Sequence, residues 1–272
     1  MTVLDAVILG LIQGLTEFLP VSSSGHLVLF RYFLNLDPSG DISFEVFVHF
    51  GTMISILVIF RKDIASLCKE FLNALLYPSK IPNLYVNSNW FRLMIFIIIG
   101  CIPAGFVGVM FEDSIEELFS DAKLTSMMLI VTGLILFFTR FVRANSNKKL
   151  GVFLSLCIGM AQAVAIIPGI SRSGATISAG LYMGLSQEMA ARFSFLMALP
   201  VIFGAALLKA FQLYHASPSS LQIIVLISAT FIAFVSGYIA IKFLLQILKR
   251  GKFTYFSYYC FLIGVIGVLF VK

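Results

Sequence analysis

The sequence Gln13-Gly-Leu-Thr-Glu17-Phe-Leu-Pro20-Val-Ser22-Ser23-Ser24-Gly25-His26 interrupts an apolar run that covers residues 3–34. A second apolar run, residues 151–185, is interrupted by Pro168-Gly-Ile-Ser171-Arg172-Ser173-Gly174-Ala-Thr176. Proline, glycine and clustered serines break helices, and a broken backbone in a bilayer must be buried in protein or line a wet cavity. We therefore expect each run to be a re-entrant helical hairpin that turns at its serines and leaves the membrane on the side where it entered.

Composition supports a membrane environment for these runs. Of 272 residues, 60% are apolar and 12% are charged, and the mean hydropathy is +1.01. Soluble domains are about one-half apolar and one-quarter charged, so a soluble fold is excluded. The net charge of +6 comes without a long basic run, which argues against nucleic-acid binding. The sequence predicts an all-α integral membrane protein that forms a single membrane domain over residues 1–272.

Six further apolar runs approach bilayer length, and each predicts a transmembrane helix. They cover residues 44–60, 90–111, 124–141, 193–214, 221–248 and 253–271. Three connecting segments are basic, and the positive-inside rule assigns them to the cytoplasm. Their cations are Arg61, Lys62, Lys69 and Lys80; Arg140, Arg143, Lys148 and Lys149; and Lys242, Lys249, Arg250 and Lys252. The loops 36–43, 112–123 and 215–220, together with the N- and C-termini, are then expected outside.

An internal repeat relates the two broken runs. Shifting the chain by 149 positions aligns six identical pairs: Gly10 with Gly159, Gln13 with Gln162, Ser22 with Ser171, Ser24 with Ser173, Gly25 with Gly174, and Phe44 with Phe193. Because the charge rule sends the spans that begin at Phe44 and Phe193 in opposite directions, the repeats have inverted topology, with repeat 1 at about residues 1–145 and repeat 2 at about 146–272. Such folds bring their broken helices together near the midplane. We therefore expect loop 20–26 to meet loop 168–176.

Charged side chains inside these runs mark a candidate site. Gln13 and Glu17 are four residues apart and share one face of a helix. A carboxylate costs roughly 2.5 to 3.5 kcal/mol in hydrocarbon, so Glu17 is expected to line a polar cavity, although a structural pairing with Arg172 or a backbone amide is the alternative. His26 is either part of this site or a hydrogen-bonded core histidine. For His49, packing with a hydrogen bond is favoured over catalysis.

Arg172 is the strongest functional signal in the second run. Its planar guanidinium suits phosphate, and flanking hydroxyls with free amides at a helix start form an anion site. A chloride or carboxylate ligand is the alternative, and serines also serve ordinary helix packing in membranes.

The two motifs resemble those of the undecaprenyl-diphosphate phosphatases of the BacA (UppP) type, and the resemblance covers essentially the whole chain. Further similar stretches are Phe44-Glu45-Val46 with Gly51, and Phe193-Ser-Phe-Leu196 with Pro200. The resemblance implies removal of one phosphate from undecaprenyl diphosphate, which yields the carrier lipid for cell-wall synthesis. It also implies a divalent cation (Mg²⁺ or Ca²⁺), a site open to the outer face of the bacterial cytoplasmic membrane, and bacitracin resistance. Bacitracin would compete for the lipid substrate rather than bind the enzyme.

In this scheme Glu17, Ser23, His26 and Arg172 are catalytic, and Glu17 with Gln13 holds the cation. Because Gln13 stands where the pattern also allows Glu, a two-carboxylate metal site is put in doubt. Substrate oxygens are expected on Ser22, Ser24, Gly25, Ser171, Ser173, Gly174 and Thr176. The favoured nucleophile is Ser23 with His26 as its general base; direct attack by His26, or water activated by His26 and Glu17, are the alternatives.

The competing class of function is a transporter or flippase for an anion or anionic lipid, because inverted repeats with broken helices are typical of secondary carriers. Expected partners are the lipid substrate and other membrane lipids, and a homodimer is left open.

Overall fold

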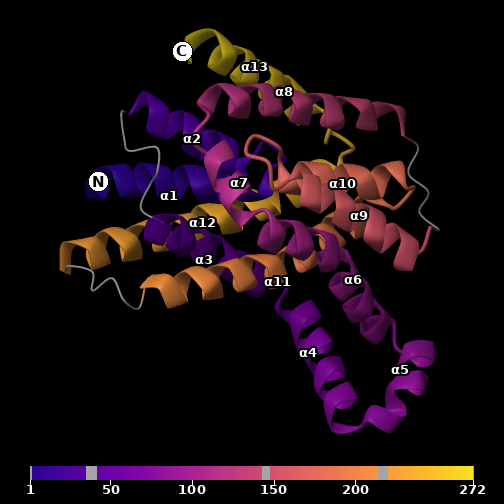
Figure 1. The fold of residues 1–272 in the computed structure, drawn as a ribbon. Helices are drawn as coiled ribbons and strands as arrows, with labels where there is room; N and C mark the ends of the chain where they lie inside the picture. Colours follow the sequence, from indigo (N-terminus) through magenta and orange to yellow (C-terminus); the bar gives the residue numbers. More distant parts are fainter. Residues whose placement is uncertain (1, 35–41, 143–147, 214–219, 272) are drawn as a thin grey trace.

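The computed structural model describes residues 2–34, 42–142, 148–213 and 220–271, and this part of the chain is helical and contains no strand (Figure 1). Its elements are α1 (Val3–Phe18), α2 (Ser23–Phe33), α3 (Ile42–Ile59), α4 (Arg61–Leu76), η1 (Pro78–Lys80), α5 (Ile81–Asn87), α6 (Asn89–Met110), α7 (Glu112–Leu118), α8 (Ala122–Phe138), η2 (Thr139–Phe141), α9 (Val152–Val164), α10 (Arg172–Tyr182), α11 (Gln187–Leu213), α12 (Ser220–Lys249) and α13 (Tyr255–Phe270).

The first apolar run is broken where the sequence predicts. Helix α1 ends at Phe18, and Leu19 takes an extended conformation (φ −63°, ψ 143°), as expected for a residue before proline. Helix α2 then begins at Ser23, and the hydroxyl of Ser22 accepts the backbone N–H of Gly25 at 3.2 Å. Ser22 itself has φ 68°, a conformation that costs a residue with a Cβ about 1 to 3 kcal/mol.

The second run is broken in the same manner. Helix α9 ends at Val164, and α10 begins at Arg172 with Ser171 as its N-cap, whose hydroxyl accepts the N–H of Gly174 at 3.0 Å. The first and last residues of α10 each lie 149 positions after those of α2, which is the offset of the sequence repeat. Both helices therefore start at the same point of the shared serine motif, with the same type of cap.

Small residues let the long helices approach these broken segments closely. Helix α1 packs along α12, and α9 packs along α6. A Cβ added to Gly10 would lie 2.7 Å from the carbonyl oxygen of Ala229, and one added to Gly159 would lie 2.4 Å from that of Gly100. Such small-residue contacts are typical of helix pairs in membranes.

Several helices are long and apolar enough to cross a bilayer. Within the described residues these are Asn89–Met110, Ala122–Phe141 and Ile223–Lys249, with a fourth if α3 and α4 are counted as one bent span. The structure thus supports a multi-pass membrane protein, and the number of six spans stays a prediction. Helix α11 begins six residues before the expected start at Phe193, and α13 is a shorter apolar helix. Of the expected spans and loops, Arg143, Tyr214, and residues 36–41 and 215–219 lie outside the described residues.

The basic segment after the first expected span was predicted to be a loop, but the structure shows helices there. It forms α4, η1 and α5, and α4 is bent by 87° from α3 (Figure 1).

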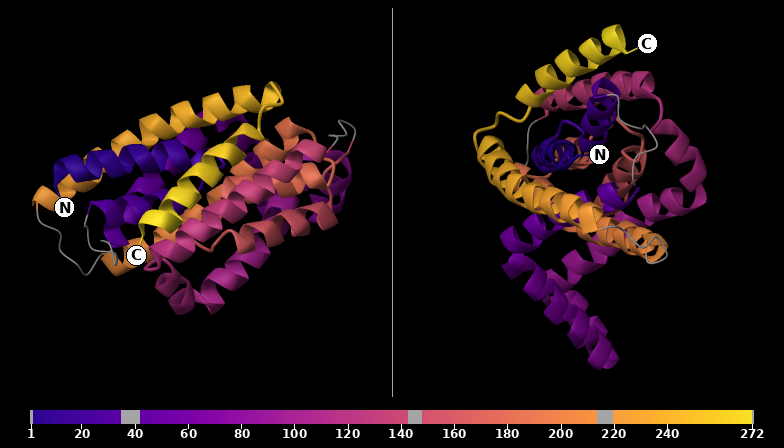
Figure 2. Two further views of the ribbon diagram at one scale, coloured as in Figure 1. Left: turned by 90° about the horizontal axis from the view of Figure 1, so that it is seen from above. Right: turned by 90° about the vertical axis from the view of Figure 1, so that its left-hand side faces the viewer.

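The chain ends lie toward one end of the bundle, while the α3–α4 bend, the start of α9 and the end of α12 lie toward the other (Figures 1 and 2). Positive charge indicates the side of the membrane on which a segment lies, but it does not distinguish a loop from an amphipathic helix.

Candidate active site

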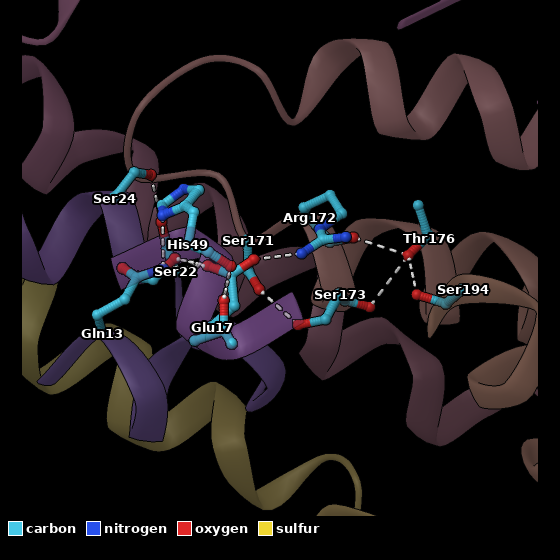
Figure 3. A network of polar contacts seen from close by, with 12 residues as sticks. Gln13, Glu17, Ser22, Ser24, His49, Ser171, Arg172, Ser173, Thr176 and Ser194 are labelled. Carbon is cyan, nitrogen blue, oxygen red and sulfur yellow. Dashed lines mark hydrogen bonds and ion pairs between the residues drawn. The ribbon is translucent and has the colours of Figure 1, made fainter. Parts of the chain in front are cut away.

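An ion pair between Arg172 and Glu17 joins the two broken runs. A guanidinium nitrogen (Nη2) of Arg172, the first residue of α10, donates to Oε1 of Glu17, near the end of α1 (Figure 3). The side chain of Glu17 is 6% exposed and that of Arg172 is 19% exposed. Two opposite charges buried at this depth must compensate each other, since either one alone would be strongly disfavoured.

Two further donors reach the other carboxylate oxygen of Glu17. Ser23 Oγ donates to Oε2 at 2.6 Å, and Gln13 Nε2 donates to the same atom at 2.8 Å. Gln13 Nε2 also lies 2.8 Å from Nδ1 of His49. Figure 3 shows both side chains next to the ion pair. The predicted common face of Gln13 and Glu17 is thus confirmed, and His49 makes the hydrogen bond expected of it.

The serine loops of the two runs pack directly against each other, as the repeat predicted. Ser173 Oγ donates to the carbonyl of Leu19 at 3.1 Å. A Cβ added to Gly25 would lie 3.2 Å from Cα of Gly169, and one added to Gly174 would lie 3.4 Å from Cβ of Pro20. The N-terminal ends of α2 and α10 therefore lie close together, and helix N-termini carry positive partial charge.

Thr132 of α8 holds the second loop in shape. Its hydroxyl donates to the carbonyl of Gly169 at 2.8 Å and accepts the N–H of Ser171 at 3.0 Å. Gly169 has φ 91°, and a Cβ there would lie 2.2 Å from the carbonyl oxygen of Thr125, so glycine is required at this turn. Thr132 was not a predicted site residue, because its role depends on α8 packing beside a loop 37 residues away.

Most of the predicted substrate-binding hydroxyls have partners inside the protein. Ser22 and Ser171 cap α2 and α10, and the hydroxyl of each lies 3.2 Å from that of the serine two positions later, Ser24 or Ser173. Thr176 Oγ1 donates to the carbonyl of Arg172 at 2.8 Å and lies 2.6 Å from Ser194 Oγ of α11. Ser22, Ser171, Ser173 and Thr176 are also buried. These four hydroxyls order the loops before any ligand arrives.

Only a few groups of the site are accessible from outside the protein. Ser23, Ser24, His49 and Arg172 are partly exposed, whereas Gln13 and Glu17 are buried beneath them. An incoming anion would first meet hydroxyls and the guanidinium, with the carboxylate behind. This order suits a negatively charged ligand, because the exposed groups are hydrogen-bond donors.

His26 lies in the same loop, and its hydrogen bonds differ from those expected. Nδ1 lies 2.8 Å from the carbonyl oxygen of Ser22, and Nε2 lies 2.9 Å from the hydroxyl of Tyr259, whose ring stacks on the imidazole. A neutral imidazole satisfies both contacts if Nδ1 donates and Nε2 accepts. The expected pairing of Ser23 with His26 as its base is therefore corrected: Ser23 donates to Glu17 instead. Sequence reasoning missed Tyr259, which lies 233 positions from His26.

The residues predicted to hold a cation offer a small set of hard oxygen donors. Oε1 of Gln13 is buried and has no hydrogen-bond partner among the described residues, while Nε2 of the same amide donates to the Glu17 carboxylate. The described part of the chain contains no cluster of three or more His, Cys, Asp or Glu side chains that could hold a metal. Oxygen donors suit Mg²⁺ or Ca²⁺, and substrate and water oxygens complete such sites. The donor set fits a cation that is shared between protein and ligand.

Apolar helices that surround a buried carboxylate and guanidinium, held between two helix breaks, define a multi-pass membrane protein with a polar internal site. Residues 6–266 match the family model described as bacitracin resistance protein BacA, and the chain belongs to this family. The chain is 45% identical over 269 residues to an undecaprenyl-diphosphatase of Salinibacter ruber, covering 98% of this chain and 99% of that protein. It is 42% identical over 272 residues to one of Halothermothrix orenii, covering 99% and 98%. The resemblance of the two motifs is thereby confirmed at the level of the family.

Proposed function

We propose that the protein is an undecaprenyl-diphosphatase, a phosphoric anhydride hydrolase that converts undecaprenyl diphosphate to undecaprenyl phosphate and inorganic phosphate. This reaction recycles the carrier lipid for cell-wall synthesis. The observation that carries the proposal is the Glu17–Arg172 pair between the serine-capped starts of α2 and α10. The names and near-complete coverage of the relatives support the same reaction, and nothing observed favours the transporter alternative.

Arg172 binds the terminal phosphate in this proposal. A guanidinium makes two parallel hydrogen bonds to phosphoryl oxygens, and the N–H groups at the starts of α2 and α10 add donors without net charge. The partly exposed hydroxyl of Ser24 supplies a further contact. Substrate oxygens then replace Glu17 as the partner of Arg172, and Oε2 of the carboxylate, which faces Ser23, accepts a proton.

Ser23 is the proposed nucleophile, and Glu17 is its base, because the Ser23 hydroxyl already donates to that carboxylate at 2.6 Å. Ser23 Oγ attacks the terminal phosphorus while its proton passes to Glu17. The bond from phosphorus to the bridging oxygen breaks, and undecaprenyl phosphate leaves with that oxygen and the proton. Water then attacks the phosphoserine, gives a proton to Glu17, and releases inorganic phosphate as Ser23 regains its proton.

His26 positions this loop in the proposal rather than carrying the proton. Its contacts with Ser22 and Tyr259 fix the residue before Ser23, where the backbone turns with φ 68°. Stabilising a turn at the nucleophile keeps its hydroxyl directed at Glu17, and small errors in such placement lower rates steeply.

A divalent cation, Mg²⁺ or Ca²⁺, is proposed on Oε1 of Gln13 and the carboxylate of Glu17. When bound, it would neutralise charge on the diphosphate. The unpartnered, buried state of the Gln13 oxygen within the described residues supports this assignment.

We further propose six transmembrane helices, two re-entrant hairpins (α1–α2 and α9–α10) and an inverted-topology repeat. The equal offset of α2 and α10, their matching serine caps, and the close packing of α1 on α12 and of α9 on α6 support the repeat. In this arrangement the termini and the mouth of the site face outside the cytoplasmic membrane, and the basic segments face the cytoplasm.

Purified protein in detergent tests the function, because a transporter alone releases no phosphate. Undecaprenyl diphosphate should be converted to the monophosphate with equimolar inorganic phosphate. Arg172→Ala should abolish release while the protein still inserts into membranes. A matched control is Arg192→Lys, which alters another ion-paired arginine outside the site. Absence of phosphate release by the unaltered protein, or near-normal release by Arg172→Ala, would refute the proposal.

A further inference from the structure

A large basic cavity lies apart from the candidate active site. It has a volume of about 1010 Å³ and lies among α5, the start of α6, the segment before α9, and α11. None of its lining residues belongs to the Glu17–Arg172 network. The proposed phosphatase reaction gives this cavity no role.

Four cations line the cavity, and no carboxylate is found among the described residues of its wall. The cations are Arg92, Lys148, Lys149 and Arg192. One of them is neutralised, because Arg192 Nε donates to Asp63 Oδ2 at 2.6 Å. Arg92 donates to the neutral side chain of Asn89 at 2.5 Å, and both lysines are exposed. The cavity therefore presents a surplus of positive charge drawn from three separate parts of the chain.

Apart from Asn89, the rest of the lining is aromatic or apolar. The guanidinium of Arg192 lies over the ring of Trp90, with 4.9 Å between its Cζ and the ring centroid. The other apolar residues of the wall are Tyr85, Leu93, Phe96, Leu150 and Met189. A free phosphate ion needs neither an apolar wall nor this volume. A lipid uses both, because its phosphate binds cations while its glycerol and upper chain need apolar surface.

The position of the cavity matches the depth of lipid headgroups. It lies at the start of α6, which is long and apolar enough to span a membrane. Nearby, α4 turns by 87° from α3 and carries Lys62 and Lys69 beside exposed Leu72 and Leu75. A helix with cations flanking an exposed apolar stripe is typical of the membrane–water interface.

We propose that this cavity binds the phosphate head of an anionic membrane lipid. Arginine and lysine clusters between membrane helices on the cytoplasmic side recognise acidic headgroups, and the three cations without a carboxylate partner satisfy that chemistry here. Arg92, Lys148 and Lys149 contact the phosphate, while Trp90 and Phe96 contact the upper part of the chains. The site is separate from catalysis, so it holds whether or not the proposed phosphatase reaction is correct.

Trp90 allows a direct test, because it is the only tryptophan in the chain and lines the cavity. The full-length protein is reconstituted with brominated phosphatidylglycerol or brominated phosphatidylcholine, and quenching of Trp90 fluorescence is measured against lipid mole fraction. The anionic lipid should reach half-maximal quenching at a mole fraction about tenfold lower than the zwitterionic lipid. Equal quenching by the two lipids would overturn the proposal.

Paired variants connect the preference to the cavity. Lys148→Gln with Lys149→Gln should reduce the lipid preference to within about twofold, and Arg92→Gln should reduce it in part. The matched control is Lys249→Gln with Arg250→Gln, an adjacent basic pair outside the cavity that should leave the preference intact. A preference that survives the Lys148/Lys149 change contradicts the assignment. Phosphatase activity of every variant is measured in parallel. Retained activity shows that a variant is folded and that its substitutions do not affect catalysis.

A titration with inorganic phosphate distinguishes binding of a lipid headgroup from binding of a free phosphate ion. In zwitterionic detergent, millimolar phosphate should leave Trp90 emission unchanged and should not displace the brominated anionic lipid. A saturable emission change with phosphate alone, together with loss of the lipid preference, would assign the cavity to a soluble phosphate and overturn the lipid proposal.

Discussion

Arg172 binds the carboxylate of Glu17 from 155 positions away in the sequence, so an ion pair links the two broken runs of the chain. Arg172 is partly exposed beside the hydroxyls of Ser23 and Ser24, whereas Glu17 is buried behind them. Before a ligand binds, the ion pair keeps both charges compensated; during the proposed reaction, the guanidinium and carboxylate act separately.

Removing the charges of Glu17 and Arg172 one at a time and together should separate their contribution to stability from their contribution to activity. Glu17→Gln or Arg172→Met leaves one buried charge unpaired and should destabilise the protein by about 3 kcal/mol, whereas the double variant should lose about 1 kcal/mol. All three should release phosphate at least about 100-fold more slowly. Thermal unfolding in detergent, followed by Trp90 fluorescence, gives the stability order. A double variant that is less stable than both single variants would show that the pair does not act as a unit.

Ser23 should carry phosphate transiently. Rapid quenching of the enzyme with substrate labelled in the terminal phosphate should trap acid-stable label on Ser23, and Ser23→Ala should remove both the label and turnover. Ser24→Ala is the matched control, since that side chain is also partly exposed but does not contact Glu17, and it should keep turnover within about tenfold. Label on His26, or full activity in Ser23→Ala, would exclude the serine nucleophile.

Tyr259→Phe should identify the role of His26. The substitution keeps the ring that stacks on the imidazole and removes only the hydrogen bond of 2.9 Å to Nε2. Loss of one such bond should reduce kcat by up to about tenfold, because His26 positions the loop. The pH–rate profile should keep its shape. A displaced limb in that profile would instead indicate that His26 transfers the proton.

Gly169→Ala should destabilise the second loop. The residue has φ 91°, and its new Cβ would lie 2.2 Å from the carbonyl oxygen of Thr125, so the expected loss is about 2 kcal/mol or more. Gly105→Ala provides the control, because a Cβ there meets nothing within 4 Å and alanine favours the helix. Gly169→Ala should unfold at a clearly lower temperature than Gly105→Ala. Equal unfolding temperatures would argue against a left-handed turn at Gly169.

Chelation should stop phosphate release, and Mg²⁺ or Ca²⁺ should restore it. Gln13→Glu adds a second carboxylate beside Glu17 and should lower the cation concentration needed for half-maximal activity by about tenfold. Gln13→Ala removes the amide oxygen proposed as a ligand and should raise that concentration. Undiminished activity after thorough chelation, with no response to added cation, would remove the metal from the mechanism.

The sequence alone determined where the helices break and which charged groups are exceptional. Pro20, Ser22 and Ser171 act on neighbouring residues, so the starts of α2 and α10 follow from local chemistry. Because charged residues are scarce in this apolar chain, the sequence alone was enough to identify Glu17 and Arg172 as candidate site residues. The prediction of a loop at α4 was wrong, because its cations also suit the polar face of an amphipathic helix.

The repeat predicted that the two serine loops meet, but only the tertiary structure decided which side chains contact each other there. It directs the Ser23 hydroxyl to Glu17, brings Tyr259 of α13 to His26, and places Thr132 of α8 and Ser194 of α11 behind the second loop. Caps and breaks depend on contacts within a few residues, whereas these partners lie on other helices. Their choice depends on how the helices pack, and that packing is decided by close contacts along their whole length, which no local motif specifies.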